Sequence, residues 1–134
     1  MPTILLDSNV ILDVWNLDPV WQVWSRDQLR RLSLLHELAI NPIIYPEISV
    51  SFATSTALDE KLADLGVFVV SIPRRAAFLA GKVYLQYRRQ SGTKTNVLPD
   101  FFIGAHASVL GCPLLTRDTR RYQAYFPSVR LIAP

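Results

Sequence analysis

The chain has 134 residues, 50% of them apolar, and its 14 basic and 11 acidic side chains give a formal net charge of +3. This size and apolar content predict one folded domain over residues 1–134 and exclude a disordered chain. The single cysteine, Cys112, excludes an internal disulfide and a zinc site built from cysteines. There is no basic leader and no apolar run of about 18 residues, so we expect a cytoplasmic protein without membrane contact.

The first third of the chain predicts a strand followed by two helices. A short continuous apolar run at residues 3–6 is typical of a strand buried on both faces. Asp7 or Ser8 should cap a helix that runs through residue 15. A second helix is expected from Asp18, which is followed by proline, to about residue 35.

The rest of the chain alternates strands and helices, marked by β-branched runs, prolines at helix starts and glycines at helix ends. Strands are expected at 38–40, 67–71, 114–116 and 129–132, and helices just after Pro42 or Pro46, at 55–65 with Ser55 or Thr56 as cap, at 73–89, at 99–110 and near Tyr122. Residues 90–97 should form a loop. This alternation predicts an α/β fold with a central parallel sheet covered on both faces, and such sheets bind ligands beyond the carboxyl ends of their strands.

Four acidic residues lie at or just after the end of short apolar runs: Asp7, Glu47, Asp100 and Asp118. If the runs beside Asp7 and Asp118 are neighbouring parallel strands, the four carboxylates converge at one edge of the sheet. A cluster of this kind repels itself unless cations neutralise it, and oxygen ligands suit Mg²⁺ or Mn²⁺. The sequence therefore predicts a metal-dependent enzyme.

Each of these acids also has a simpler explanation to be weighed. Asp7 and Asp118 would cap the helices that follow them, and Asp100 would lie at a helix start, where the macrodipole favours a negative charge. Glu47, among apolar neighbours, has no obvious local role. Because all the simpler explanations must hold together, a shared site is the favoured interpretation. His106 lies on a different face of its helix from Asp100 and is expected to be a packed side chain.

The basic residues suggest a polyanionic substrate. If bound metal neutralises the four clustered acids, 14 basic side chains face 7 acidic ones in the rest of the chain. Solvated helix faces would explain any one arginine doublet, whereas a basic rim around an acidic pocket would bind phosphates. We expect substrate-binding side chains at Arg88, Arg89, Lys94 and Arg117.

These segments together resemble the PIN-domain nucleases, and more narrowly the VapC-type toxins of bacterial and archaeal toxin–antitoxin pairs. The segment at Asp7 matches the opening hydrophobic-Asp-x-Asn pattern, and the segment ending at Asp118 matches the closing hydrophobic-Thr-x-Asp pattern. LPDFFIGAHASVLG is similar to the family's Asp-x-x-Ile-x-Ala-x-Ala helix, from which Gly104 and His106 depart. The resemblance extends over nearly the whole chain, from residue 4 to residue 132.

The resemblance implies a three-layer α/β/α sandwich and a Mg²⁺- or Mn²⁺-dependent endoribonuclease that hydrolyses RNA phosphodiester bonds with metal-activated water. It also implies a homodimer and a cognate antitoxin that inhibits it. The residues that correspond to the family's site are Asp7, Glu47, Asp100 and Asp118 as metal-binding and catalytic acids, with Asn9 and Thr116 as accessory polar positions.

Other functions fit the sequence less well. A haloacid-dehalogenase phosphatase needs a second aspartate where this chain has Asn9, and a receiver domain needs a late lysine, whereas Lys94 is the last one. A catalytically silent PIN-like domain that binds RNA or protein, and a PIN nuclease of RNA processing without an antitoxin, stay open as alternatives. Three tryptophans crowd the first two predicted helices, and they are either core residues or part of a surface for a protein partner.

Overall fold

The computed structural model describes residues 2–90, 92–94 and 97–134, which form five strands and seven helices. In chain order the elements are β1 (Thr3–Leu6), α1 (Ser8–Trp15), α2 (Gln22–Ser33), β2 (Glu37–Ile40), α3 (Ile44–Ser49), α4 (Ser55–Leu65), β3 (Val67–Val69), α5 (Arg74–Arg89), α6 (Leu98–Leu110), β4 (Leu114–Leu115), α7 (Arg120–Tyr125) and β5 (Leu131–Ile132). Within these described residues, no helix is long and apolar enough to cross a membrane.

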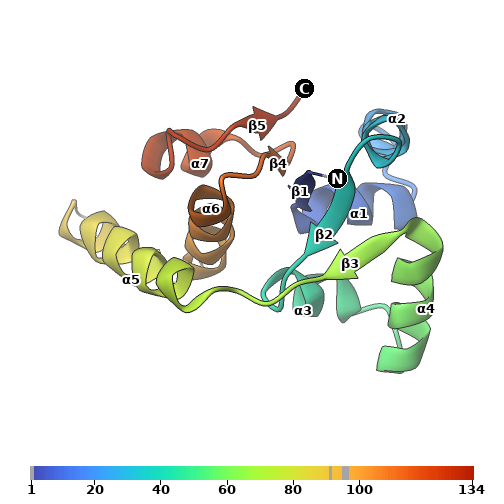
Figure 1. Ribbon diagram of the computed structural model, residues 1–134, viewed down its shortest axis with the longest axis horizontal. Helices are drawn as coiled ribbons and strands as arrows, with labels where there is room; N and C mark the ends of the chain where they lie inside the picture. Colours follow the sequence, from blue (N-terminus) through green and yellow to red (C-terminus); the bar gives the residue numbers. More distant parts are fainter. Residues whose placement is uncertain (1, 91, 95–96) are drawn as a thin grey trace.

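The strands form one parallel sheet in the order β3-β2-β1-β4-β5. Helices α1, α2 and α4 lie on one side of the sheet, and α6 and α7 lie on the other, with α5 packed outside α6 (Figure 1). The predicted α/β/α sandwich is therefore confirmed. The chain builds β1, β2 and β3 outward in one direction and then returns to the other side of β1 with β4 and β5, so the order reverses between β1 and β4, where sheets of this kind place ligand sites.

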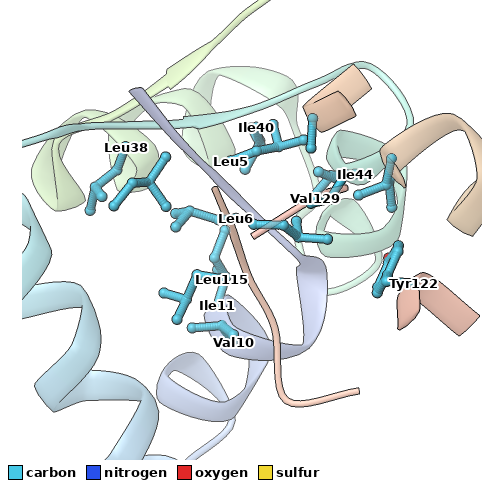
Figure 2. Packing of buried hydrophobic residues seen from close by; sticks show 14 of the residues in the cluster. Leu5, Leu6, Val10, Ile11, Leu38, Ile40, Ile44, Leu115, Tyr122 and Val129 are labelled. Carbon is cyan, nitrogen blue, oxygen red and sulfur yellow. The ribbon is translucent and has the colours of Figure 1, made fainter. Parts of the chain in front are cut away.

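The core explains why β1 is the centre of the sheet. The apolar side chains of β1, β2 and β4 are buried on both faces, with Ile4, Leu6 and Leu115 each 0% exposed. Figure 2 shows Leu6 of β1 and Leu115 of β4 in the same cluster as Val10 and Ile11 of α1. Because a fully buried aliphatic side chain contributes roughly 1.5–3 kcal/mol, these short strands are held in place mainly by the helices that pack on them.

Local boundaries depart from the sequence expectations in a few places. Helix α2 begins at Gln22 rather than at Asp18, because the Asp18 carboxylate accepts hydrogen bonds from the backbone N–H groups of Val20 and Trp21 and forms a turn first. It ends at Ser33 instead of residue 35. Strand β3 is shorter than predicted, and Thr54, not Ser55 or Thr56, caps α4. The predicted loop at 90–97 lies partly outside the described residues.

The glycine that departs from the family helix pattern has a packing reason. In α6, the aromatic ring of Phe126 lies directly against Gly104, and a Cβ at that position would clash with the ring. Phe126 in turn packs against Phe101, at a ring centroid distance of 6.1 Å. Gly104 therefore lets the segment after α7 approach α6 closely, on the side of the sheet where the acidic residues lie.

Candidate metal centre

Asp7 joins the end of β1 to the start of α1. Its backbone N–H donates to the carbonyl of Leu115, which fixes β1 beside β4, and its Oδ1 accepts from the N–H of Ser8 at 2.9 Å. The capping role is therefore confirmed, yet it uses only one carboxylate oxygen. Oδ2 accepts from the hydroxyls of Thr116 at 2.9 Å and Tyr122 at 3.0 Å. Asp7 is only 5% exposed.

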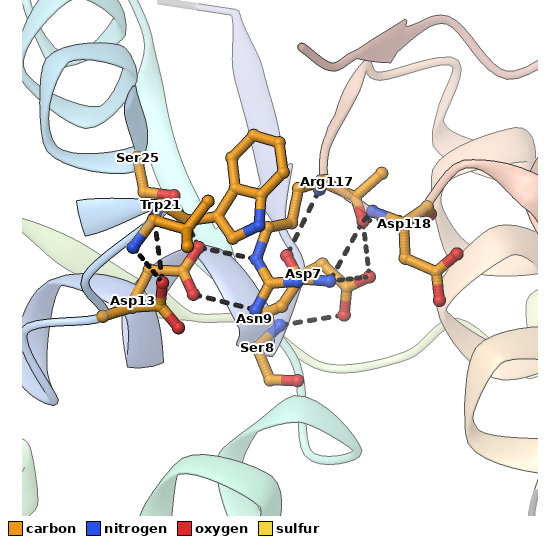
Figure 3. Close-up of polar contacts among 11 residues, drawn as sticks. Asp7, Ser8, Asn9, Asp13, Trp21, Ser25, Arg117 and Asp118 are labelled. Carbon is orange, nitrogen blue, oxygen red and sulfur yellow. Dashed lines mark hydrogen bonds and ion pairs between the residues drawn. The ribbon is translucent and has the colours of Figure 1, made fainter. Parts of the chain in front are cut away.

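The predicted accessory residues lie beside Asp7. The Asn9 amide group donates to the Thr116 hydroxyl at 3.3 Å, and its carbonyl oxygen accepts from the N–H of Arg117. The Thr116 hydroxyl also accepts from the backbone N–H of Asp118 at 3.1 Å. This network ties the turn after β4 to the first turn of α1, as Figure 3 shows for Asn9, Asp7 and Asp118.

The four predicted acids are electrostatic neighbours. Burial raises the pKa of Asp7, and the charge of Asp100 raises it further. Burial also raises the pKa of Glu47, again with the charges of Asp7 and Asp100 adding to it. The pKa of Asp100 is raised by burial and by the charge of Asp118. The carboxylates therefore repel one another across four segments that are far apart in sequence.

Two side chains that the sequence did not single out donate hydrogen bonds to carboxylates of this acidic cluster. Arg121 of α7 donates to the Asp100 carboxylate at 2.8 Å, which opposes the rise in the pKa of Asp100. Tyr122 donates to Asp7, and burial and the nearby acids raise the pKa of its phenol well above the ordinary value. The only sequence signal was the Arg120–Arg121 doublet shortly after Asp118.

The chemistry of the donors fits a divalent cation, although the ligands are not assembled. Among residues 2–90, 92–94 and 97–134, no three acidic, histidine or cysteine side chains stand close enough together to hold a metal. However, one carboxylate oxygen of Glu47 is buried, has no hydrogen-bond partner in the part of the chain that the structure describes, and lies beside carboxylates that repel it. A cation would satisfy this oxygen and remove the repulsion. Binding would require Arg121 to release Asp100.

The structure tests the simpler explanations for the acids, which were helix capping and a position at a helix start. Asp118 is exposed and does not cap α7, since Thr119 is the cap residue and no side-chain bond is made there. Asp100 lies in the first turn of α6, as predicted, but its carboxylate is bound by Arg121. Helix capping therefore accounts for part of Asp7, and a position in the first turn of α6 together with Arg121 accounts for Asp100, whereas Glu47 and Asp118 keep no such explanation.

The predicted substrate-binding residues separate into two groups. The guanidinium of Arg117 donates two hydrogen bonds to the carboxylate of Asp13, at 2.8 and 2.9 Å (Figure 3). The same guanidinium lies 5.7 Å from the centre of the Trp21 ring. Asp13 is 2% exposed and also accepts from Ser25, so the sequence reasoning missed a buried ion pair there. Arg117 thus gains no support as a substrate contact.

The remaining predicted substrate residues are available to a ligand. Lys94 lines a cavity that Asp118 also lines. Arg88 and Arg89 are exposed in the last turn of α5. Their substrate contacts stay a prediction.

A buried polar link connects the helix of Glu47 to the helix of Asp100. Asn41 follows β2, and its side-chain amide oxygen accepts from the N–H groups of Ile43 and Ile44 at 3.0 Å, which satisfies two backbone donors at the start of α3. Its amide donates to Nδ1 of His106 in α6, also at 3.0 Å. Burial lowers the pKa of His106, so the imidazole is neutral and can accept this bond, and the prediction of a packed histidine is confirmed.

Asn41→Ala should lower the free energy of unfolding by about 2–4 kcal/mol, because it leaves two backbone N–H groups at the start of α3 and a buried imidazole nitrogen without their partner. Urea denaturation followed by circular dichroism measures this loss. Asn16→Ala, at the exposed end of α1, is the matched control and should change stability by less than about 0.5 kcal/mol. Equal losses in both variants would show that the Asn41–His106 link contributes nothing.

Comparisons with known proteins agree with this architecture. A family model described as the PIN domain matches residues 4–127, whereas no curated protein matches the chain. Similar solved structures include VapBC2 from Rickettsia felis bound to a fragment of promoter DNA, with 17% identity over 98% of both chains and a TM-score of 0.75. VapBC-1 from nontypeable Haemophilus influenzae is 20% identical over 98% of this chain and 97% of that one, with a TM-score of 0.71. FitAcB from Neisseria gonorrhoeae is 22% identical over 96% of both, with a TM-score of 0.65. At these identities, the likeness concerns the fold.

Proposed function

The chain belongs to the PIN-domain family, and on that basis we propose that it is a metal-dependent endoribonuclease that serves as the toxin of a type II toxin–antitoxin pair. The observation that carries this proposal is a buried oxygen of Glu47 in α3 that has no hydrogen-bond partner among the described residues, close enough to Asp7 at the end of β1 and Asp100 in α6 for the three carboxylates to repel one another. Buried like charges are unfavourable for a fold, so their presence points to a cation that binds them during function.

Asp7 and Asp100 are the proposed anchors for Mg²⁺ or Mn²⁺, with Glu47 and Asp118 completing the site directly or through water. A metal bound there supplies an activated water and neutralises charge on the phosphate that is attacked. Thr116 and Tyr122 keep Asp7 in one orientation through their hydroxyls. Arg121, once it leaves Asp100, is placed to stabilise negative charge on the substrate.

A cleavage assay tests the proposed activity. The purified protein should cut single-stranded RNA in millimolar Mg²⁺ or Mn²⁺ and should lose that activity in excess EDTA. Sequencing the new RNA ends after induction in cells would identify the target. If the protein binds RNA but yields no metal-dependent ends, it is instead a catalytically silent PIN-like domain. Specific cleavage without any effect on growth would favour an RNA-processing nuclease without an antitoxin.

A cognate antitoxin and a second copy of the chain are the proposed partners, acting in the cytoplasm. The similar structures include a toxin–antitoxin complex from Klebsiella pneumoniae. In this chain, exposed apolar side chains at Leu17, Val20 and Val23 adjoin the half-buried pair Trp21 and Trp24. Such a surface is typical of protein contacts. Expression alone should arrest growth, and co-expression of the cognate antitoxin should restore it. Sedimentation at micromolar concentration should show a dimer.

A further inference from the structure

A cavity of about 410 Å³ lies next to the acidic cluster, between the end of α5 and the helix α7. Its lining includes Tyr87, Lys94, Asp118, Arg120, Arg121 and Tyr125, and we refer to it as the tyrosine pocket. This volume falls within the range of roughly 300–1,000 Å³ that small-ligand sites occupy in proteins. The pocket is therefore large enough for part of a substrate strand.

The tyrosine pocket is rich in positive charge. Lys94 and Arg120 are both exposed, and in the part of the chain that the structure describes neither forms an ion pair. Arg121 adds a third cation at the boundary with the acidic cluster, where it binds Asp100. Cationic side chains of this kind, free to bind and held in a concave surface, recognise phosphate groups.

The two tyrosines of the pocket pack against Phe101, which is buried beneath them. The rings of Tyr87 and Tyr125 lie 5.9 Å apart and nearly perpendicular, and both pack against Phe101, at 5.5 and 5.3 Å. Both tyrosines are half-buried, so each is fixed on one side while still reaching the pocket. A rigid aromatic ring beside cations is the combination that binds an unpaired base together with its phosphate.

The pocket shares residues with the proposed metal site. Asp118 and Arg121 belong to both, so a nucleotide in the pocket lies next to the phosphate at the acidic cluster. A larger cavity, of about 750 Å³, lies between α3, α4 and β3, but its lining contains no lysine or arginine and includes Asp59. That cavity does not suit a polyanion.

We propose that the tyrosine pocket binds one nucleotide of single-stranded RNA, adjacent to the phosphate that is cleaved. The unpaired base stacks on Tyr125, and Lys94 and Arg120 bind its phosphate. Because a base can stack on a protein ring only when it is not paired within a duplex, the site selects unpaired segments of RNA. The inference deepens the proposed nuclease function, but the binding itself requires no metal.

The test measures binding by fluorescence anisotropy of a labelled single-stranded ten-nucleotide RNA in EDTA, where no cleavage occurs. The Lys94→Ala, Arg120→Ala double variant should bind at least 10-fold more weakly, and the slope of log affinity against log salt should fall by about 1.4, since two phosphate contacts are lost. Tyr125→Ala should weaken binding about 5- to 150-fold, whereas Tyr125→Phe keeps the ring and should bind nearly as wild type.

The matched control is Arg74→Ala, Arg75→Ala, which removes the same charge from exposed positions at the opposite end of α5. It should change affinity by less than about 3-fold. Equal losses of RNA affinity in the control and pocket double variants would overturn the site. Unchanged RNA affinity in the pocket variants would also overturn it, even if those variants lost antitoxin binding. If the pocket variants lose RNA binding while wild type shows no metal-dependent cleavage, the nuclease function fails and the pocket stands.

Discussion

Asp100→Asn is expected to reduce Mg²⁺- or Mn²⁺-supported RNA cleavage by at least about 100-fold while leaving the circular dichroism spectrum unchanged. The reduction is large because loss of one preorganised electrostatic contact to a reacting group costs this much in other enzymes. The fold should survive, since the side chain keeps its shape and is not part of the apolar core. The charge of Asp100 also raises the pKa values of Asp7 and Glu47, so its removal relieves repulsion.

The control for Asp100→Asn is Glu60→Gln, which removes a carboxylate from the exposed face of α4, away from the acidic cluster. It should cleave RNA at the wild-type rate. Arg121→Ala separates the two roles of the Asp100 carboxylate, because it removes the ion pair but keeps the proposed metal ligand. Full activity of Asp100→Asn, or wild-type cleavage in excess chelator, would contradict the assignment of the metal site.

Sequence patterns predicted the elements that carry the site because those signals are local. The apolar run at Thr3–Leu6, the proline before α5 and the left-handed glycines at the ends of α4 and α6 each act within one or two turns of chain. The convergence of Asp7 with Thr116 also followed from local signals, since the ends of adjacent parallel strands meet at one edge. The start of α2 shifted because the Asp18 carboxylate forms a turn, and the end of α2 and the end of β3 came earlier than the local pattern predicted.

The other polar partners of the site could not be predicted because no sequence pattern marks which side chains meet across the packed elements. Arg117 meets Asp13 across 104 residues, and Tyr122 meets Asp7 across 115. Asp13 looked like an ordinary helix residue, since no periodicity distinguishes a buried ion pair from an exposed acid. The pairing of Arg121 with Asp100 spans 21 residues and depends on the angle at which α7 packs on α6. Such pairs are properties of packing, which a single sequence does not encode locally.

Divalent metal should stabilise the fold, and the effect should depend on pH. A ligand that binds only the native state adds RT ln(1 + [L]/Kd) to the free energy of unfolding, about 2.7 kcal/mol at one hundred times Kd. For a domain of this size that corresponds to a rise in Tm of roughly 10 °C. Differential scanning fluorimetry in millimolar Mn²⁺ at pH 7.5 should show this rise for wild type and should not show it for the Asp7→Asn, Asp100→Asn double variant.

The sign of the pH dependence follows from the raised pKa values of Asp7, Glu47 and Asp100. A carboxyl group whose pKa is raised by folding stabilises the native state below its unfolded pKa, near 4, and that contribution is lost as the pH rises through the raised value. The metal-free cluster is therefore least favourable at neutral pH, where the carboxylates are charged and available to a cation. The Mn²⁺-induced rise in Tm should be largest above pH 7 and should nearly vanish near pH 4, where protons compete for the same oxygens. A rise that is equal at both pH values, or that NaCl of matched ionic strength reproduces, would assign the stabilisation to general screening and not to these carboxylates.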